Sequence, residues 1–236
     1  MKRIVTTELL DSDSGTPSEV VASLADLRRI NRWFGGNATT RASIERVSKQ
    51  LQTREISLLE VAAGTGETPR IVKSQLRDRG IEVDVTLLDR MSSHLTVHQA
   101  SPANGCRAVA GDALALPFRD ASFDLVSCSL FAHHLSPEQL VAFVNEALRV
   151  SRHAVLINDL VRHRTHLAFV LAGLPLFRSR LTWNDAPASV RQAYTRQEMK
   201  ALLAETSAAR FEIHKHYLFR MSVLAWKQQA WVQAHA

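Results

Sequence analysis

The chain has 236 residues, 46% of them hydrophobic and 22% charged, so it can bury a sizeable core and is neither a disordered segment nor a disulfide-dependent miniprotein. Its two cysteines, Cys106 and Cys128, form no CxxC metal pair and no disulfide framework, which favours a reducing compartment. The formal net charge of +6 is compatible with RNA, an anionic membrane or an acidic substrate, although a solvated basic surface accounts for it more simply.

The N-terminal region is predicted to be helical. The chain meets Glu8 before any long apolar stretch, so we identify no secretory signal and expect a cytoplasmic protein. Apolar residues then recur at helical spacing from Thr16 to about Leu51. The run Gly35-Gly36-Asn37 is expected to break this pattern, with a second helix over 42–51. Residues 1–55 would form a helical cap.

From residue 56 the pattern changes to short apolar runs separated by helix-like stretches. Strands that alternate with helices of this length form βαβ units, so we predict an α/β fold with a parallel sheet and helices on both faces. The predicted strands are Ile56–Ala62, Val83–Leu88, Arg107–Ala110, Phe123–Ser129 and Val155–Leu160.

The alternation stops after Leu160, and residues 161–194 are predicted to be a lid insertion. Its lid segment is His166–Phe177, and the nearly uncharged part, Leu167–Phe177, is too short to cross a bilayer, which takes roughly 20 apolar residues in a helix. Together with Trp183 it would select an apolar or aromatic ligand, although simple core packing explains such a segment equally well.

The last part, residues 195–236, regains a regular pattern. A helix is predicted around Thr195–Glu205. Two strand-like runs follow, Phe211–Leu218 and Met221–Trp226, and the turn between them is too short for a helical crossover. They are therefore expected to close the sheet as an antiparallel hairpin, within a single domain over 1–236.

A glycine-rich turn, Glu60-to-Gly66, links the first strand to a predicted helix. Glycines allow a ligand to approach the backbone closely, and the helix start offers N–H groups to negative charge. Asp89 ends the next strand, where a carboxylate can accept hydrogen bonds from ribose hydroxyls. Together the two features indicate that the ligand contains a nucleoside. Alternatively, the glycine-rich turn is purely structural and Asp89 only caps the following helix.

The turn departs from the dinucleotide fingerprint, because Pro69 stands where that motif requires a third small residue. A nicotinamide dehydrogenase is therefore poorly supported. Two further motifs follow along the chain, Gly111-to-Phe118 and Phe123-to-Leu135.

In order and spacing, the four motifs resemble those of the class I S-adenosylmethionine-dependent methyltransferases, in particular the small-molecule branch that includes quinone-biosynthesis enzymes. The resemblance covers roughly residues 58–160. It implies a Rossmann-like sheet of seven strands, mostly parallel, with a cofactor-binding core over 56–160. The implied cofactor is S-adenosylmethionine.

The resemblance also implies roles for single residues. The glycine-rich turn would face the methionine portion of the cofactor, Asp89 would hold both ribose hydroxyls, and Asp112 would accept from the adenine amino group. Ala62 stands where many relatives have glycine, and an alanine fits there if its φ is negative. The residues implied in cofactor binding are Glu60, Ala62, Gly64, Thr65, Gly66, Asp89, Arg90, Met91, Asp112, Ala113, Ser129 and Leu130.

His133 and His134 are the catalytic candidates, because they follow the fourth strand at the edge where open α/β sheets bind ligands. A histidine can take a phenolic or alcohol proton near neutral pH. We expect only one of them to face the pocket; alternatively, the pair opens a helix or packs beneath the lid. Asn158 and Asp159 end the fifth strand at the same edge of the sheet. They are expected either to contact the substrate or to cap the next helix.

No metal is predicted. His94 and His98 are four residues apart in a predicted helix, but the spacing shows no third ligand.

The sequence thus predicts methyl transfer from S-adenosylmethionine to a small apolar or aromatic acceptor, most simply a phenolic oxygen. The alternatives are C-methylation of a quinone precursor, RNA methylation and a non-catalytic binding module. We expect no nucleic-acid partner. Ser129-Leu130-Phe131-Ala132 differs from the Asn/Asp-Pro-Pro-aromatic tetrapeptide of methyltransferases that act on base amino groups, which argues against such bases but not against RNA in general. The acceptor's identity and the oligomeric state stay open.

Overall fold

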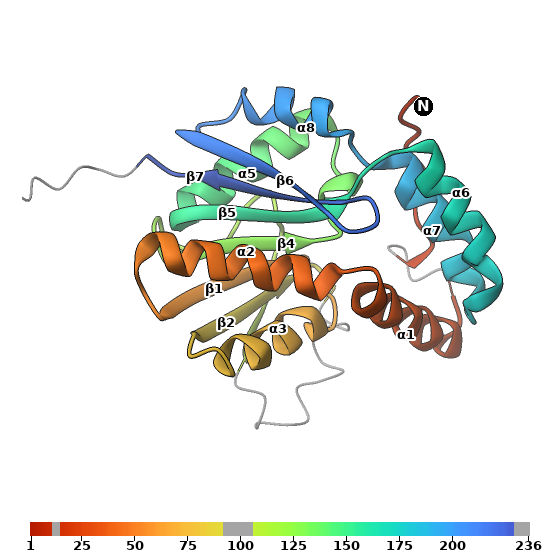
Figure 1. Ribbon diagram of the computed structural model, residues 1–236, viewed down its shortest axis with the longest axis horizontal. Helices are drawn as coiled ribbons and strands as arrows, with labels where there is room; N and C mark the ends of the chain where they lie inside the picture. The colour runs from red at the N-terminus through yellow and green to blue at the C-terminus, as the bar shows by residue number, and fades with distance from the viewer. Residues whose placement is uncertain (11–14, 92–105, 229–236) are drawn as a thin grey trace, which may run out of the picture.

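The computed structural model describes residues 1–10, 15–91 and 106–228 (Figure 1). The strands are β1 (Glu55–Val61), β2 (Glu82–Asp89), β3 (Cys106–Ala110), β4 (Phe123–Ser129), β5 (Ser151–Leu160), β6 (Arg210–His216) and β7 (Arg220–Trp226). The helices are α1 (Pro17–Trp33), α2 (Gly36–Leu51), α3 (Glu67–Arg77), η3 (Ala132–His134), α5 (Pro137–Val150), α6 (Arg164–Gly173), η4 (Leu174–Leu176), α7 (Arg180–Gln192) and α8 (Arg196–Leu203).

One seven-stranded sheet has the strand order β3-β2-β1-β4-β5-β7-β6. The first five strands pair in parallel, and β7 pairs antiparallel with both β5 and β6. This confirms the predicted Rossmann-like α/β fold and its closing hairpin.

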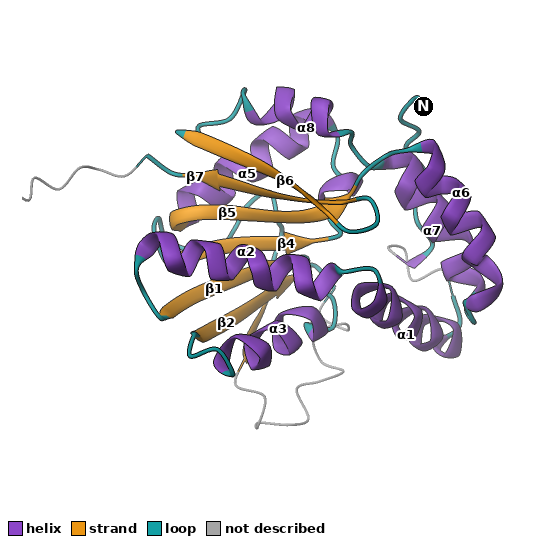
Figure 2. Ribbon diagram, in the orientation of Figure 1, coloured by secondary structure: helices purple, strands orange, loops and turns teal. Residues whose placement is uncertain are grey.

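Helices cover both faces of the sheet (Figure 2). On β1, Leu58 packs in a core cluster with residues of α2 and α3, whereas its neighbour Leu59 packs on the other face with residues of α5 and α8. Successive strand side chains point to opposite faces, so a strand buried on both sides needs a continuous apolar run. This explains why the short apolar runs located the strands well.

Helices α1, α6 and α7 gather at one end of the sheet, beyond the carboxyl ends of β1, β4 and β5 (Figure 1). These helices and η4 carry several exposed large apolar side chains, including Trp33, Phe169, Leu176 and Trp183. The apolar segment of α6 and η4 is therefore not simply packed in the core, which was the alternative to a lid.

Helix α2 begins at Gly36, not at residue 42 as the glycine run had suggested. Gly35 alone makes the break, in the left-handed conformation with φ of 76°. A Cβ atom on Gly36 would lie 2.4 Å from Asn31 Oδ1, so that glycine serves the close approach of the two helices.

A buried polar network holds the α1–α2 turn on the sheet. Asn158 donates to the Gly36 carbonyl at 2.9 Å and to the Thr40 hydroxyl at 2.8 Å. The buried guanidinium of Arg220 donates to the Phe34 carbonyl at 3.1 Å and to Asn31 Oδ1 at 2.8 Å. Asn158 therefore does not cap the next helix; the N-cap of α6 is His163.

Candidate functional site

The site is built where β1 and β4 lie side by side in the centre of the sheet. The chain leaves β1 for α3, which packs on one face, and leaves β4 for α5, which packs on the other. A crevice at the carboxyl ends of two such diverging strands is the usual ligand site of open α/β sheets.

The glycine-rich turn and Asp89 meet at this edge, as predicted. Asp89 Oδ2 accepts a hydrogen bond from the Gly64 amide at 2.7 Å, and its Oδ1 accepts one from the Met91 amide at 2.9 Å. A Cβ atom on Gly64 would meet nothing within 4 Å, so a ligand can reach the backbone there. Gly66 is required by packing, because its Cβ would lie 2.4 Å from Leu87.

Two residues beside this turn adopt the left-handed backbone conformation. Ala62 has φ of 53°, so the condition of a negative φ, under which an alanine fits without strain, is not met at this position. The next amide, of Ala63, turns across to donate to the Leu88 carbonyl at 3.0 Å. Leu130, at the end of β4, has φ of 56° and donates its amide to the Asn158 carbonyl. Left-handed non-glycine residues of this kind cluster at functional sites.

The remaining residues implied in cofactor binding lie along the same edge. Gly111 donates to the Asp89 carbonyl at 3.1 Å, which brings the end of β3 beside β2. Asp112 is exposed, and its Oδ1 accepts from the Leu114 amide at 2.9 Å. Ala113 packs against the core, and Arg90 is exposed.

Glu60 lies within the sheet, and the hydroxyl of Ser127 on β4 donates to its carboxylate. Burial raises the pKa of this carboxyl to about 7, although the hydroxyls of Ser127 and Ser129 act in the opposite direction. The folded protein therefore holds a proton on Glu60 that the unfolded chain would release near pH 4.5.

This raised pKa predicts a pH-dependent stability. Because ionisation is easier in the unfolded chain, the contribution is fully present below pH 4.5 and is lost as the pH rises through 7. Glu60→Gln removes the titration. Relative to that variant, the ligand-free wild type should lose about 2 to 3 kcal/mol of unfolding free energy between pH 5 and pH 8. Urea denaturation of both proteins measures this, and a constant difference across the range would contradict it.

The histidine pair follows β4 in the short helix η3. His133 is 2% exposed, and its Nδ1 lies 2.7 Å from Asp159 Oδ1. Its backbone amide donates to Asp159 Oδ2 at 2.9 Å. Burial alone would lower the pKa of His133, but the charge of Asp159 and its hydrogen bond, together with Glu8, raise that pKa to about 10. His134 is the more accessible, with 21% of its side chain exposed. Asp159 thus binds a histidine and does not cap the next helix, α6, whose N-cap is His163.

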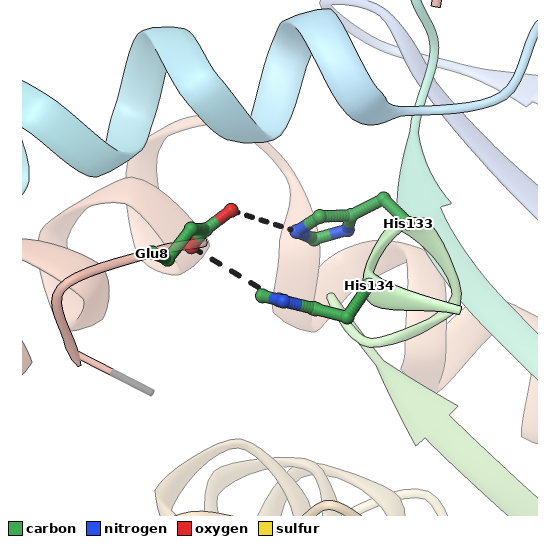
Figure 3. A group of neighbouring side chains, drawn as sticks. All are labelled: Glu8, His133 and His134. Atoms are coloured by element: carbon green, nitrogen blue, oxygen red, sulfur yellow. Dashed lines mark ion pairs between the residues drawn. The ribbon is translucent and has the colours of Figure 1, made fainter. Parts of the chain in front are cut away.

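Sequence reasoning missed Glu8, which the N-terminal segment brings to the two histidines (Figure 3). The segment is held by Arg3, whose guanidinium donates to the carbonyls of His133 and Leu135 at 3.0 and 2.8 Å. The amides of Leu9 and Leu10 donate to the two oxygens of Asp185 on α7. No local pattern in the sequence signals a contact across more than 120 residues.

One other feature of the described residues lies apart from this site. A surface hollow of about 860 Å³ is lined by the amino ends of β1 and β2, at the opposite edge of the sheet from Asp89. His94 and His98 fall outside the described residues. Of the helices in the described part of the chain, none has the length and apolar character of a membrane span.

Comparison with known proteins gives a consistent picture. Residues 58–154 match the family model of a methyltransferase domain. The chain is 39% identical over 95 residues to a demethylmenaquinone methyltransferase of Beutenbergia cavernae, a match covering 40% of this chain and 36% of that protein. It is 31% identical over 103 residues to an uncharacterized methyltransferase of Schizosaccharomyces pombe, covering 43% and 38% of the two chains. The matched region thus spans well under half the length of these curated relatives.

Solved structures share the fold over nearly the whole chain. The plantazolicin methyltransferase BpumL, solved in complex with SAH, superposes with a TM-score of 0.73 at 13% identity, covering 94% of this chain and 95% of that one. The magnesium protoporphyrin IX methyltransferase of Synechocystis has a TM-score of 0.56 at 12% identity, covering 87% and 94%.

Proposed function

We propose that this chain, a member of the class I S-adenosylmethionine-dependent methyltransferases, transfers a methyl group to a small apolar or aromatic acceptor. The observation that carries the proposal is the Asp89 carboxylate, bonded to the Gly64 amide beside an open stretch of backbone at the β1–β4 edge.

The residues at this edge suit the cofactor. A carboxylate on the second strand accepts hydrogen bonds from ribose hydroxyls, and each oxygen of Asp89 retains acceptor capacity beyond its one backbone amide. The exposed Asp112 is available to the adenine amino group. Bound S-adenosylmethionine supplies an electrophilic methyl group on its sulfonium. The protein's task is to hold the acceptor atom in line with that methyl and to exclude water.

The acceptor class is inferred from the helices at this end of the sheet. Phe169 on α6, Leu176 on η4 and Trp183 on α7 expose apolar side chains, which favours an apolar or aromatic molecule. His134, the more accessible histidine, is placed to take a hydroxyl proton. A phenolic oxygen therefore fits best. The 39% identity to a demethylmenaquinone methyltransferase supports C-methylation of a quinone precursor as the second candidate.

We also propose that residues 1–236 form a single domain, and that it acts in the cytoplasm on a small molecule and not on nucleic acid. Two observations support the compartment: the described cysteines, Cys106 and Cys128, are both free, and Cys128 is buried.

The first experiment is calorimetric titration with S-adenosylmethionine, S-adenosylhomocysteine and NAD. We expect micromolar binding of the first two and none of NAD. Phenols and quinols are then screened with methyl-labelled cofactor, and NMR of the product distinguishes an O-methyl from a C-methyl group. Preference for NAD would overturn the proposal.

A further inference from the structure

The N-terminal segment and the histidine pair bring three side chains with metal-ligand atoms together. The ligand atoms of Glu8, His133 and His134 all lie within 4.8 Å of one another. His133 Nε2 is 3.6 Å from Glu8 Oε1, and His134 Nε2 is 4.0 Å from Glu8 Oε2. Both separations exceed the 2.7–3.2 Å of an N–H···O hydrogen bond, yet the three side chains point toward a common centre (Figure 3).

We propose that Glu8, His133 and His134 bind a first-row divalent cation such as Zn²⁺. Bonds of about 2.1 Å to imidazole nitrogen and carboxylate oxygen place tetrahedral ligands about 3.4 Å apart, so small side-chain movements complete the site. Two imidazoles with one carboxylate are a donor set that suits zinc and iron, and a fourth position stays open on the more exposed side, at His134.

The surrounding contacts orient the ligands as they do in protein metal sites. Asp159 holds His133 Nδ1 at 2.7 Å and so turns Nε2 toward Glu8, an arrangement typical of metal-binding histidines. Glu8 Oε1 accepts from the Ser189 hydroxyl and the Gln192 amide, both at 2.6 Å, which fixes its carboxylate.

The charges around His133 are compatible with a bound cation. Glu8 and Asp159 are both buried beside His133, and a divalent cation at its Nε2 would take the place of the proton that these two carboxylates favour there. The guanidinium of Arg3 is engaged with backbone carbonyls beside the histidines and with the ring of Tyr194, 4.2 Å away.

This site goes beyond the proposed function. A cation bound to His134 Nε2 occupies the lone pair of that nitrogen, so His134 could not then accept a proton. The metal-bound protein would instead activate the acceptor hydroxyl by coordinating its oxygen. Methyl transfer is proposed in either case, and the cation is tested without cofactor or acceptor.

The test is titration of the chelator-treated full-length protein with Zn²⁺ by calorimetry and with Co²⁺ by visible absorption. We expect one equivalent to bind. Asp159→Asn, which changes only the partner of a ligand, should weaken binding about 10- to 100-fold, and Glu8→Gln and His134→Gln by more. His134→Gln is the safest variant for folding, because that side chain is partly exposed.

The matched control is His214→Gln, which removes a histidine that pairs with Glu212 on β6 at 3.1 Å, away from the site. Its affinity for Zn²⁺ should equal that of the wild type. The proposal is overturned if the wild type shows no saturable binding, or if His134→Gln and Glu8→Gln bind Zn²⁺ as the wild type does, since the cation would then be adventitious.

Discussion

Replacing Asp89 by alanine is expected to weaken the binding of S-adenosylmethionine by roughly 100-fold, about 3 kcal/mol, because hydrogen bonds to a charged acceptor contribute the most. S-adenosylhomocysteine should lose affinity by a similar factor, since it carries the same ribose. Calorimetry on the purified variant measures both. The matched control is Asp84→Ala, an exposed carboxylate on the same strand that pairs with Arg107, where we expect no change in affinity.

A structural effect must be separated from loss of the ribose contact, since Asp89 also accepts from the amides of Gly64 and Met91. A 2′-deoxy analogue of S-adenosylhomocysteine separates them. The wild type should bind it about tenfold more weakly than the parent compound, and Asp89→Ala should bind the two equally. If the variant keeps the wild-type preference for the parent, Asp89 does not hold the ribose.

The sequence predicted the core of the fold because burial there follows a simple rule. Strands covered on both faces are mostly apolar, and the strand predicted over Phe123–Ser129 has the same bounds in the structure although it includes Asp124. The closing hairpin was predictable for a similar reason, since a short connection allows only antiparallel pairing.

The features that the sequence predicted wrongly, or did not reveal, depend on backbone geometry or on contacts between distant parts of the chain. Gly36 was taken as a helix breaker, although it lies inside α2 and serves the contact with Asn31. The positive φ of Ala62 could not be read from the sequence, because residue propensities do not show that the next amide, of Ala63, reaches the Leu88 carbonyl. Glu8 was invisible as a site residue, since only the folded chain brings an N-terminal carboxylate to η3.

The same contacts decide which histidine can be tested cleanly for a catalytic role. Removing His133 would leave the buried carboxylate of Asp159 without its partner, a change that destabilises proteins strongly whatever the chemistry. His134 is partly exposed and stacks on Phe131, with ring centroids 6.4 Å apart, so its loss should spare the fold.

We therefore expect His134→Ala to lower kcat by about 100- to 10,000-fold on the acceptor that the screen identifies, the range that a positioned acid–base group contributes. Affinity for S-adenosylmethionine should not change, because His134 is not among the residues assigned to the cofactor. Added imidazole should restore part of the rate, since the truncated side chain leaves accessible space. The control is His214→Ala, whose kcat should equal that of the wild type. An unchanged kcat in His134→Ala would mean that the acceptor needs no group at this position, as for an already ionised nucleophile.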